Sequence, residues 1–159
     1  MRRRIGVISD THGLMRPEAL RALAGSEQII HAGDIGAPEV LAALACIAPV
    51  TAVRGNNDIA AWADAIPATS VLAIDGVSVY VLHDVHGLNA DAARTHQVVI
   101  AGHSHQPDVA CRGGVLFVNP GSAGPRRFSL PVTVATLWVE GDEVEAVIEP
   151  LELPPSRRR

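Results

Sequence analysis

Short apolar runs and helix-forming segments alternate over the first 55 residues of this chain. Residues 17–24 and 38–46 each begin with a proline and continue with helix-forming residues, and proline is common at the first position of a helix. The flanking apolar runs, residues 5–9, 28–31 and 50–53, are short enough to be buried strands. Such alternation predicts a parallel sheet with crossover helices, whose site lies beyond the carboxyl ends of the strands.

The remainder of the chain is richer in predicted strands. Glycine-containing turns at residues 75–76, 112–114 and 140–142 each separate two apolar runs, as in β-hairpins. The runs beside these turns are residues 70–74, 77–82, 109–111, 115–118, 132–139 and 144–148. A helix over 89–95 and a buried strand over 98–101 complete the pattern. We expect two packed sheets with helices outside them, in one domain of residues 1–150, and a loose tail of residues 151–159.

Composition excludes several classes of protein. The chain has 159 residues, of which 48% are hydrophobic, and this suffices for a core. Its formal net charge of −4 argues against a general nucleic-acid binder, which is usually basic. Residues 5–8 are too few for a signal peptide and no apolar stretch is long enough for a membrane span, so we expect a cytoplasmic protein with no membrane partner. Cys46 and Cys111 lack neighbours at metal-ligand spacing and are expected to be buried thiols.

Five polar clusters follow predicted strands, and each offers oxygen or imidazole nitrogen. They are Asp10-Thr11-His12, Gly33-Asp34, Gly55-Asn56-Asn57-Asp58, His83 and Gly102-His103-Ser104-His105. Asp10 and His12 are two residues apart, and in extended backbone such side chains point the same way. The same reasoning applies to His103 and His105. The clusters together hold enough ligands for two divalent metal ions.

The charges of these ligands suit a phosphate. Two divalent ions bring four positive charges, of which the carboxylates of Asp10 and Asp34 cancel two. Asp34 has two oxygens with which to bridge the ions, and Asn56 offers a neutral amide oxygen. The positive surplus would attract an anionic phosphate and lower the pKa of a bridging water, so that hydroxide is available as the nucleophile near neutral pH. A two-metal centre in a small protein indicates hydrolysis of a phosphate ester.

Four segments give the chain a specific resemblance. They are Ile-Gly-Val-Ile-Ser-Asp-Thr-His-Gly (5–13), Ile-Ile-His-Ala-Gly-Asp (29–34), Val-Arg-Gly-Asn-Asn-Asp (53–58) and Val-Asn-Pro-Gly-Ser-Ala-Gly-Pro-Arg (118–126). With His83 and the Gly-His-x-His cluster in this order, the chain resembles the calcineurin-like metallophosphoesterase superfamily, and within it the small single-domain prokaryotic phosphodiesterases. The resemblance covers most of the chain, from Ile5 to Arg126.

The resemblance implies a fold, an activity and a ligand set. The fold is α/β, a four-layer α/β/β/α sandwich of two mixed β-sheets flanked by helices. The activity is metal-dependent hydrolysis of phosphodiesters, nucleotides among them, by a protein that can form dimers or tetramers. The metals are typically Mn2+, with Ni2+, Mg2+, Fe2+ and Zn2+ as alternatives. One ion would be held by Asp10, His12, Asp34 and His105, and the other by Asp34, Asn56, His83 and His103.

Two positions depart from the family pattern. Asn57 stands where many relatives have a histidine that protonates the leaving group. An amide is no general acid, so we expect weak turnover of substrates with alkoxide leaving groups. Many relatives of this branch also have His-Gly-His where this chain has His83-Asp84-Val85-His86. His83 directly ends a predicted strand and is the expected ligand, which leaves His86 as a candidate for the acid.

Three further residues are expected to support the ligands or the substrate. His31 is interpreted as a packed histidine behind Asp34 rather than a ligand, and Asp58 as a partner of a ligand or a cap of the next turn. Arg54 either meets the substrate phosphate or forms a structural ion pair.

Two other functions compete with the diesterase. One is a non-catalytic protein-binding scaffold, because the superfamily includes a trafficking subunit with a degraded metal site. The complete ligand set favours the enzyme. The other is a phosphomonoesterase or nucleotidase, against which the amide at Asn57 argues.

Overall fold

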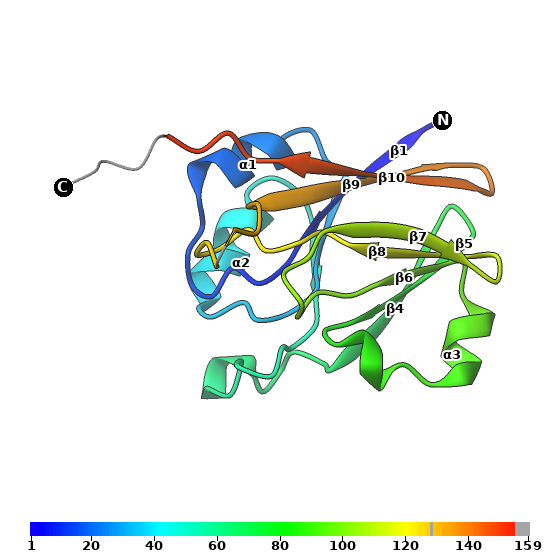
Figure 1. The fold of residues 1–159 in the computed structure, drawn as a ribbon, viewed down its shortest axis with the longest axis horizontal. Coiled ribbons are helices and arrows are strands. Elements are labelled where there is room, and N and C mark those ends of the chain that lie inside the picture. Colours follow the sequence, from blue (N-terminus) through cyan, green and yellow to red (C-terminus); the bar gives the residue numbers. More distant parts are fainter. Residues whose placement is uncertain (128, 155–159) are drawn as a thin grey trace.

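Two mixed five-stranded sheets pack face to face and carry helices outside them (Figure 1). This computed structural model describes residues 1–127 and 129–154. The first sheet has the order β10-β9-β1-β2-β3, with β1 (Arg3–Ile8), β2 (Gln28–His31), β3 (Val50–Ala52), β9 (Thr133–Glu140) and β10 (Glu143–Pro150). The second has the order β4-β5-β6-β8-β7, with β4 (Thr69–Ile74), β5 (Val77–Leu82), β6 (Val98–Ile100), β7 (Asp108–Arg112) and β8 (Val115–Asn119). The helices are α1 (Pro17–Leu23), α2 (Pro38–Ala45) and α3 (Ala90–Thr95), with short 3-10 turns η1 (Ala61–Ala63) and η2 (Val85–Gly87).

Each sheet contains three parallel strands and two strands that are added in antiparallel pairs. In the first sheet β1, β2 and β3 are parallel, β9 pairs antiparallel with β1, and β10 pairs antiparallel with β9. In the second sheet β5, β6 and β8 are parallel, and hairpins add β4 and β7 at the edges. The predicted α/β sandwich of two mixed sheets is therefore confirmed.

Local sequence explains where the helices begin. Both α1 and α2 have a proline in the first turn, where a missing N–H costs nothing. The third helix, α3, starts at Asn89, whose side chain accepts a hydrogen bond from the Ala92 N–H at 2.8 Å. That contact satisfies one of the N–H groups that a helix start leaves open.

Three apolar clusters hold the layers together. The main cluster lies between the sheets and consists of Val, Ile, Leu and Ala side chains from both of them. A second cluster packs α1 and α2 on the outer face of the first sheet, and a small third cluster covers the outer face of the second sheet. Burying each such aliphatic side chain contributes roughly 1.5–3 kcal/mol, so the sheets have a fixed relative position.

The carboxyl ends of the parallel strands meet between the two sheets. The Asp10 N–H after β1 donates to Gly33 O after β2 at 3.0 Å, and the Gly102 N–H after β6 donates to His83 O after β5 at 2.9 Å. The His103 N–H joins the two sheets by donating to the Asp10 carboxylate at 3.0 Å. The loops that carry the predicted ligands are thus held against one another.

The expectation that both cysteines are buried is wrong. Cys46 and Cys111 are free and exposed. Cys46 follows the last residue of α2, and Cys111 lies on β7 at the edge of the second sheet. Both positions face outward, and the spacing of apolar residues around them does not show it.

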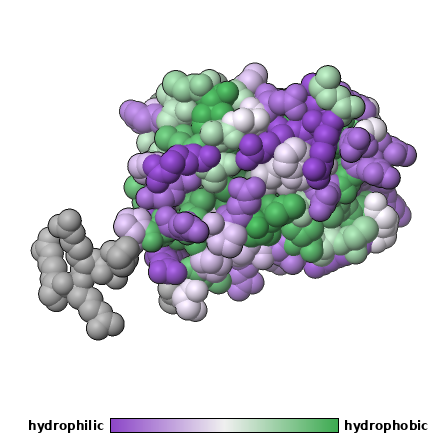
Figure 2. Space-filling model, turned by 90° about the horizontal axis from the view of Figure 1, so that it is seen from above, coloured by the Kyte–Doolittle hydropathy of each residue, from purple (hydrophilic) through white to green (hydrophobic). Residues whose placement is uncertain are grey.

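The surface and the chain end add little to the site. Figure 2 shows hydrophilic residues spread between smaller hydrophobic areas on the face seen from above, which is ordinary for a protein surface. No helix of the described part of the chain is long and apolar enough to cross a membrane.

The strand β10 runs to Pro150, and Leu151 N–H still donates to Val132 O at 2.9 Å. The rest of the predicted tail, residues 155–159, lies outside the described residues.

Candidate metal centre

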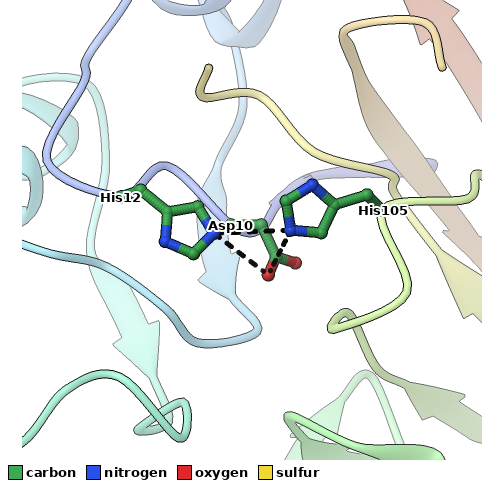
Figure 3. A group of neighbouring side chains, drawn as sticks. All are labelled: Asp10, His12 and His105. Carbon is green, nitrogen blue, oxygen red and sulfur yellow. Dashed lines mark hydrogen bonds and ion pairs between the residues drawn. The ribbon is translucent and has the colours of Figure 1, made fainter. Parts of the chain in front are cut away.

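The Asp10 carboxylate has one satisfied and one bare oxygen. Oδ2 accepts hydrogen bonds from the Ser9 hydroxyl at 2.7 Å and from the His103 N–H at 3.0 Å. Oδ1 is buried without a hydrogen-bond partner among the described residues. It lies 3.3 Å from His105 Nε2 and 3.7 Å from His12 Nε2, and the two rings converge on it (Figure 3).

The Asp34 carboxylate forms the second half of the cluster. Asn57 donates its backbone N–H to Oδ1 and its side-chain Nδ2 to Oδ2, both at 3.0 Å. The same Oδ2 lies 3.3 Å from His83 Nε2 and 3.8 Å from His12 Nε2. His83 Nε2 is also 3.9 Å from the bare oxygen of Asp10. Two overlapping groups result, Asp10-His12-His105 and Asp10-Asp34-His83, each suited to hold a cation.

The hydrogen bonds of His83 direct its free nitrogen at both carboxylates. Its Nδ1 donates to Ala32 O at 2.8 Å, and its Nε2 is buried without a hydrogen-bond partner in the described part of the chain. A backbone carbonyl that receives one ring N–H is the usual arrangement behind a metal-bound histidine. Burial lowers the pKa of His83, but the contacts with Asp34 and Ala32 outweigh it, and the pKa is raised.

The spacing of two histidines and the ionisation of Asp34 and His105 fit divalent cations. Atoms bound to one ion at about 2.0–2.2 Å lie roughly 2.8–3.6 Å apart at octahedral or tetrahedral angles. His12 Nε2 and His105 Nε2 are 3.4 Å apart, within that range. Burial raises the pKa of Asp34, but the close contact with His83 and the hydrogen bonds from Asn57 outweigh it and hold the pKa below its usual range. Burial lowers the pKa of His105, which favours the neutral imidazole that a metal requires.

Left-handed backbone directs these side chains into the site. Five predicted ligands have positive φ, namely Asp10 (55°), His12 (46°), Asp34 (55°), His103 (71°) and His105 (63°). The expectation of extended backbone is therefore wrong for both Asp10 with His12 and His103 with His105. The side chains of Asp10 and His12 still converge, whereas His103 lies against His83 and His105 against Asp10. Such a conformation costs on the order of 1–3 kcal/mol per residue and is typical of functional sites.

Two glycines allow the loops to approach the carboxylates. A side chain at Gly102 would overlap the Ser9 hydroxyl and reach within 2.6 Å of Asp10 Oδ2. A side chain at Gly55 would overlap the Asp34 carboxylate and its backbone N. These close contacts explain why glycine precedes the predicted ligands in both clusters.

His31 is buried behind the cluster. Its Nδ1 accepts from the Gly33 N–H at 3.1 Å, so its Nε2 carries the proton and donates to Thr11 Oγ1 at 3.0 Å. The Thr11 hydroxyl in turn donates to Ile35 O at 2.8 Å. Burial lowers the pKa of His31 to about 3. The neutral ring joins the loops after β1 and β2 and does not point at the carboxylates.

Asp58 ties the loop after β3 to the loop after β2. Its carboxylate accepts the N–H groups of Ile35, Gly36 and Gly55 at 2.9–3.0 Å. It is buried and positions Asp34 through these backbone contacts. Arg54, directly before this loop, has a buried Nε with no hydrogen-bond partner among the described residues.

The other predicted residues lie at the rim. Asn56 is exposed beside Asn57, and no hydrogen bond joins its side chain to the cluster within the described ranges. The His103 ring meets His83 edge-on at 5.2 Å between centroids, and its Nε2 lies 3.7 Å from Asp84 Oδ2. His86 is exposed over 89% of its side chain, and Asp84 Oδ1 accepts from its N–H at 3.0 Å and contacts its Nδ1 at 2.9 Å. The structure therefore brings together five of the seven predicted ligands directly, and places Asn56 and His103 beside them.

Sequence reasoning missed the residues that hold Asp10. Ser9 binds its carboxylate, and the Ser122 hydroxyl donates to Asp10 O at 2.9 Å. The Ala123 N–H donates to Ser9 O at 3.0 Å, so the segment after β8 lies against the ligand loop. The segment 118–126, which contains Ser122, contributes to the family resemblance but gives no sign of this contact.

Replacing Gly102 with alanine is expected to weaken cation binding by at least about tenfold, because the added methyl group displaces Ser9 and Asp10. Calorimetric titration of the metal-stripped protein with Mn2+ measures the effect. Gly87→Ala is the matched control, since nothing lies within 4 Å of a side chain there. Equal affinity for Mn2+ in the Gly102 variant and wild type would show that the close contact of Gly102 with Ser9 and Asp10 is not required for cation binding.

Stability of the metal-free protein should depend on pH through His31. Because its folded pKa of about 3 lies below the ordinary 6.5, the unfolded chain takes up the proton first as pH falls. The contribution of the neutral His31 ring to the free energy of unfolding is therefore complete above about pH 6.5. It is lost toward about pH 3, at about 1.4 kcal/mol per pH unit. His31→Gln should flatten this slope in urea unfolding between about pH 4 and pH 6, while His96→Gln keeps it. If His31→Gln left the pH dependence of the free energy of unfolding unchanged, His31 would not be its source.

Comparisons with known proteins agree with this geometry. Residues 3–142 match the model of the calcineurin-like phosphoesterase superfamily domain. A probable metallophosphoesterase of Methanothermobacter thermautotrophicus is 33% identical over 91% of this chain and 90% of its own. Another, of Methanocaldococcus jannaschii, is 34% identical over 93% of this chain and 81% of its own.

Solved structures share the fold. Vacuolar protein sorting 29 (Vps29) of Cryptosporidium parvum superposes with a TM-score of 0.80 at 18% identity, over 95% of this chain and 92% of its own. A structure described as a novel archaeal phosphodiesterase gives 0.74 at 24% identity, over 92% and 99% of the two chains. A Zn2+ complex of Vps29 from Entamoeba histolytica gives 0.73 at 21% identity, over 93% and 98%. The chain therefore belongs to the calcineurin-like phosphoesterase superfamily, in the branch of small single-domain prokaryotic metallophosphoesterases.

Proposed function

We propose that this protein is a metal-dependent phosphodiesterase that uses two divalent ions, with Mn2+ preferred. The observation that carries the proposal is the bare, buried Asp10 Oδ1, which lies within 3.9 Å of three imidazole nitrogens. A buried carboxylate oxygen without a hydrogen bond is costly unless a cation meets it. Carboxylate, imidazole and amide ligands together suit manganese and also zinc.

The proposed ligands divide between two ions. The first set is Asp10, His12, Asp34 and His105, and the second is Asp34, Asn56, His83 and His103. Asp10 Oδ1 lies near both sets, because it is 3.3 Å from His105 Nε2 and 3.9 Å from His83 Nε2. Divalent ions in such a centre supply positive charge for the phosphate and lower the pKa of a water molecule.

The residues around the cluster favour diesters over monoesters. Asn57 stands at the position of the acid in many relatives, but it donates its backbone N–H and its side-chain amide to Asp34, and an amide is no general acid. No proton donor is therefore available there for a poor leaving group. The fold shared with an archaeal phosphodiesterase agrees with this choice of substrate.

His86 is the proposed source of a proton for the leaving group. Asp84 Oδ1 orients its ring through Nδ1 at 2.9 Å, and the ring is exposed beside the rim of the cluster. A carboxylate that fixes one ring nitrogen leaves the other available for proton transfer. Asp84 also lies 3.7 Å from His103 Nε2, which places His86 one side chain away from a proposed ligand.

A non-catalytic scaffold remains the second candidate. The likeness to Vps29 is the observation that favours it. The bare carboxylate oxygen and the three converging imidazoles argue for a centre that holds metal. The cytoplasmic location and the homo-oligomer expected from the sequence stay predictions.

Hydrolysis of bis-p-nitrophenyl phosphate tests the proposed activity. Metal-stripped protein should gain turnover on addition of Mn2+, and Asp10→Asn should lose at least about a hundredfold because the charge that holds the cation is removed. Asp142→Asn, in the exposed β9–β10 turn, is the matched control. Folded protein that shows no turnover with any divalent ion would favour the scaffold.

Diesters with different leaving groups test the proposed role of His86 as the acid. An aryl diester should turn over faster than an alkyl diester, because phenolate leaves without a proton. His86→Ala should slow the alkyl diester by about tenfold or more with unchanged metal content, whereas His96→Ala should not. Loss of metal in the His86 variant would show that this residue is a ligand and not the acid. Equal rates on the aryl and alkyl diesters would contradict the expectation that replacement of the acid by Asn57 slows substrates with poor leaving groups.

A further inference from the structure

A hollow of about 300 Å3 lies on the outer face of the second sheet. Its floor is formed by Val99 of β6, by Ala101 directly after that strand, and by Phe117 of β8. These side chains belong to the small outer cluster and not to the core between the sheets. The volume is at the lower end of the range for small-molecule sites, which also combine an apolar floor with a few polar groups.

The upper rim of the hollow is built from the loops of the candidate metal centre. Ser104 lines it and stands in the chain between His103 and His105. Asn119, also in the lining, fixes this turn by donating to Gly102 O and Ser104 Oγ, both at 3.1 Å. Across the hollow, Val85 directly follows Asp84. The hollow therefore borders the loops that carry the proposed metal ligands.

An aromatic ring and a guanidinium face the hollow further down. The Arg112 guanidinium carbon lies 5.7 Å from the centre of the Phe117 ring. Asp108 also lines the hollow, but within residues 1–127 and 129–154 no carboxylate lies within ion-pair distance of Arg112. Aromatic rings and arginine side chains are the groups on which proteins stack nucleobases. Phe117 lies two residues, roughly 7 Å, from Asn119 along the strand, a span that a sugar bridges.

We propose that this hollow binds the nucleoside arm of a nucleotide phosphodiester, with the base against Phe117 and Arg112. The proposal rests on the proposed function, because it places the phosphate of the same molecule at the metal centre. It names the substrate class: a diester with at least one nucleoside arm.

A second hollow of the protein has the wrong charge for such a ligand. It lies beside Trp138 and is lined by Glu140, Glu143 and Glu145. Arg2 is in that lining too, but it is already paired with Glu145 at 3.3 Å and stacked 4.1 Å from the Trp138 ring. A phosphate-bearing ligand would meet uncompensated carboxylates there.

Two substrates with the same leaving group distinguish recognition of the nucleoside arm from hydrolysis of the phosphate ester. They are the p-nitrophenyl ester of thymidine monophosphate and methyl p-nitrophenyl phosphate, both assayed with the Mn2+-loaded protein. Wild type should prefer the thymidine substrate in kcat/KM by roughly tenfold, in line with stacking of one base. Phe117→Leu, which keeps the apolar volume, and Arg112→Gln should each reduce that preference at least about threefold. Arg94→Gln, an exposed arginine on α3, should leave it intact.

A direct binding measurement distinguishes failure of this proposal from failure of the proposed activity. Calorimetric titration with thymidine monophosphate should show binding to wild type that weakens in Phe117→Leu and Arg112→Gln. If neither substrate is hydrolysed but this pattern of binding is seen, the nucleotide site stands and the diesterase does not. A thymidine preference that both variants retain, or the absence of nucleotide binding by wild type, would overturn the proposal.

Discussion

The Asp10 carboxylate is the group on which the rest of the site depends, because its two oxygens do different things. One oxygen is held by the Ser9 hydroxyl and the His103 N–H, which come from different sheets. The other is left bare toward three imidazoles. A carboxylate that was satisfied on both sides would offer nothing to a cation, and one without partners would not stay in place. The core between the sheets, fully buried and aliphatic, keeps β1 and β6 at the distance this arrangement requires.

Backbone strain around the centre is offset by hydrogen bonds that surround it. The left-handed residues Asp10 and Asp34 are each followed by backbone contacts to neighbouring loops, such as His12 N–H to Asp34 O at 2.9 Å. Asp58 satisfies three further N–H groups, and His31 with Thr11 closes the space behind. Such surroundings are what allows unfavourable φ angles to persist at a functional site.

The order of elements could be predicted from the sequence because apolar periodicity and proline or glycine positions report directly on strands, helix starts and turns. The predicted ligands were found because each follows a strand, and parallel strands place such residues at one edge. The geometry of Asp10 and His12 could not be predicted, since the chain leaves the extended conformation right after β1. The contact of Ser122 with Asp10 spans 112 residues, and the exposure of Cys46 depends on packing around α2; neither is encoded in local pattern.

The predicted ligands extend from Asp10 to His105 and come from loops of both sheets, so an unfolded chain has no means of assembling them. Any cation bound there would favour the folded state alone, and its contribution grows with the logarithm of its free concentration above the dissociation constant. It would add a link between two layers that are otherwise held together by the aliphatic core and by a few hydrogen bonds, such as the one from the His103 N–H to Asp10. Supply of the metal would thus affect the stability of the folded protein as well as its chemistry.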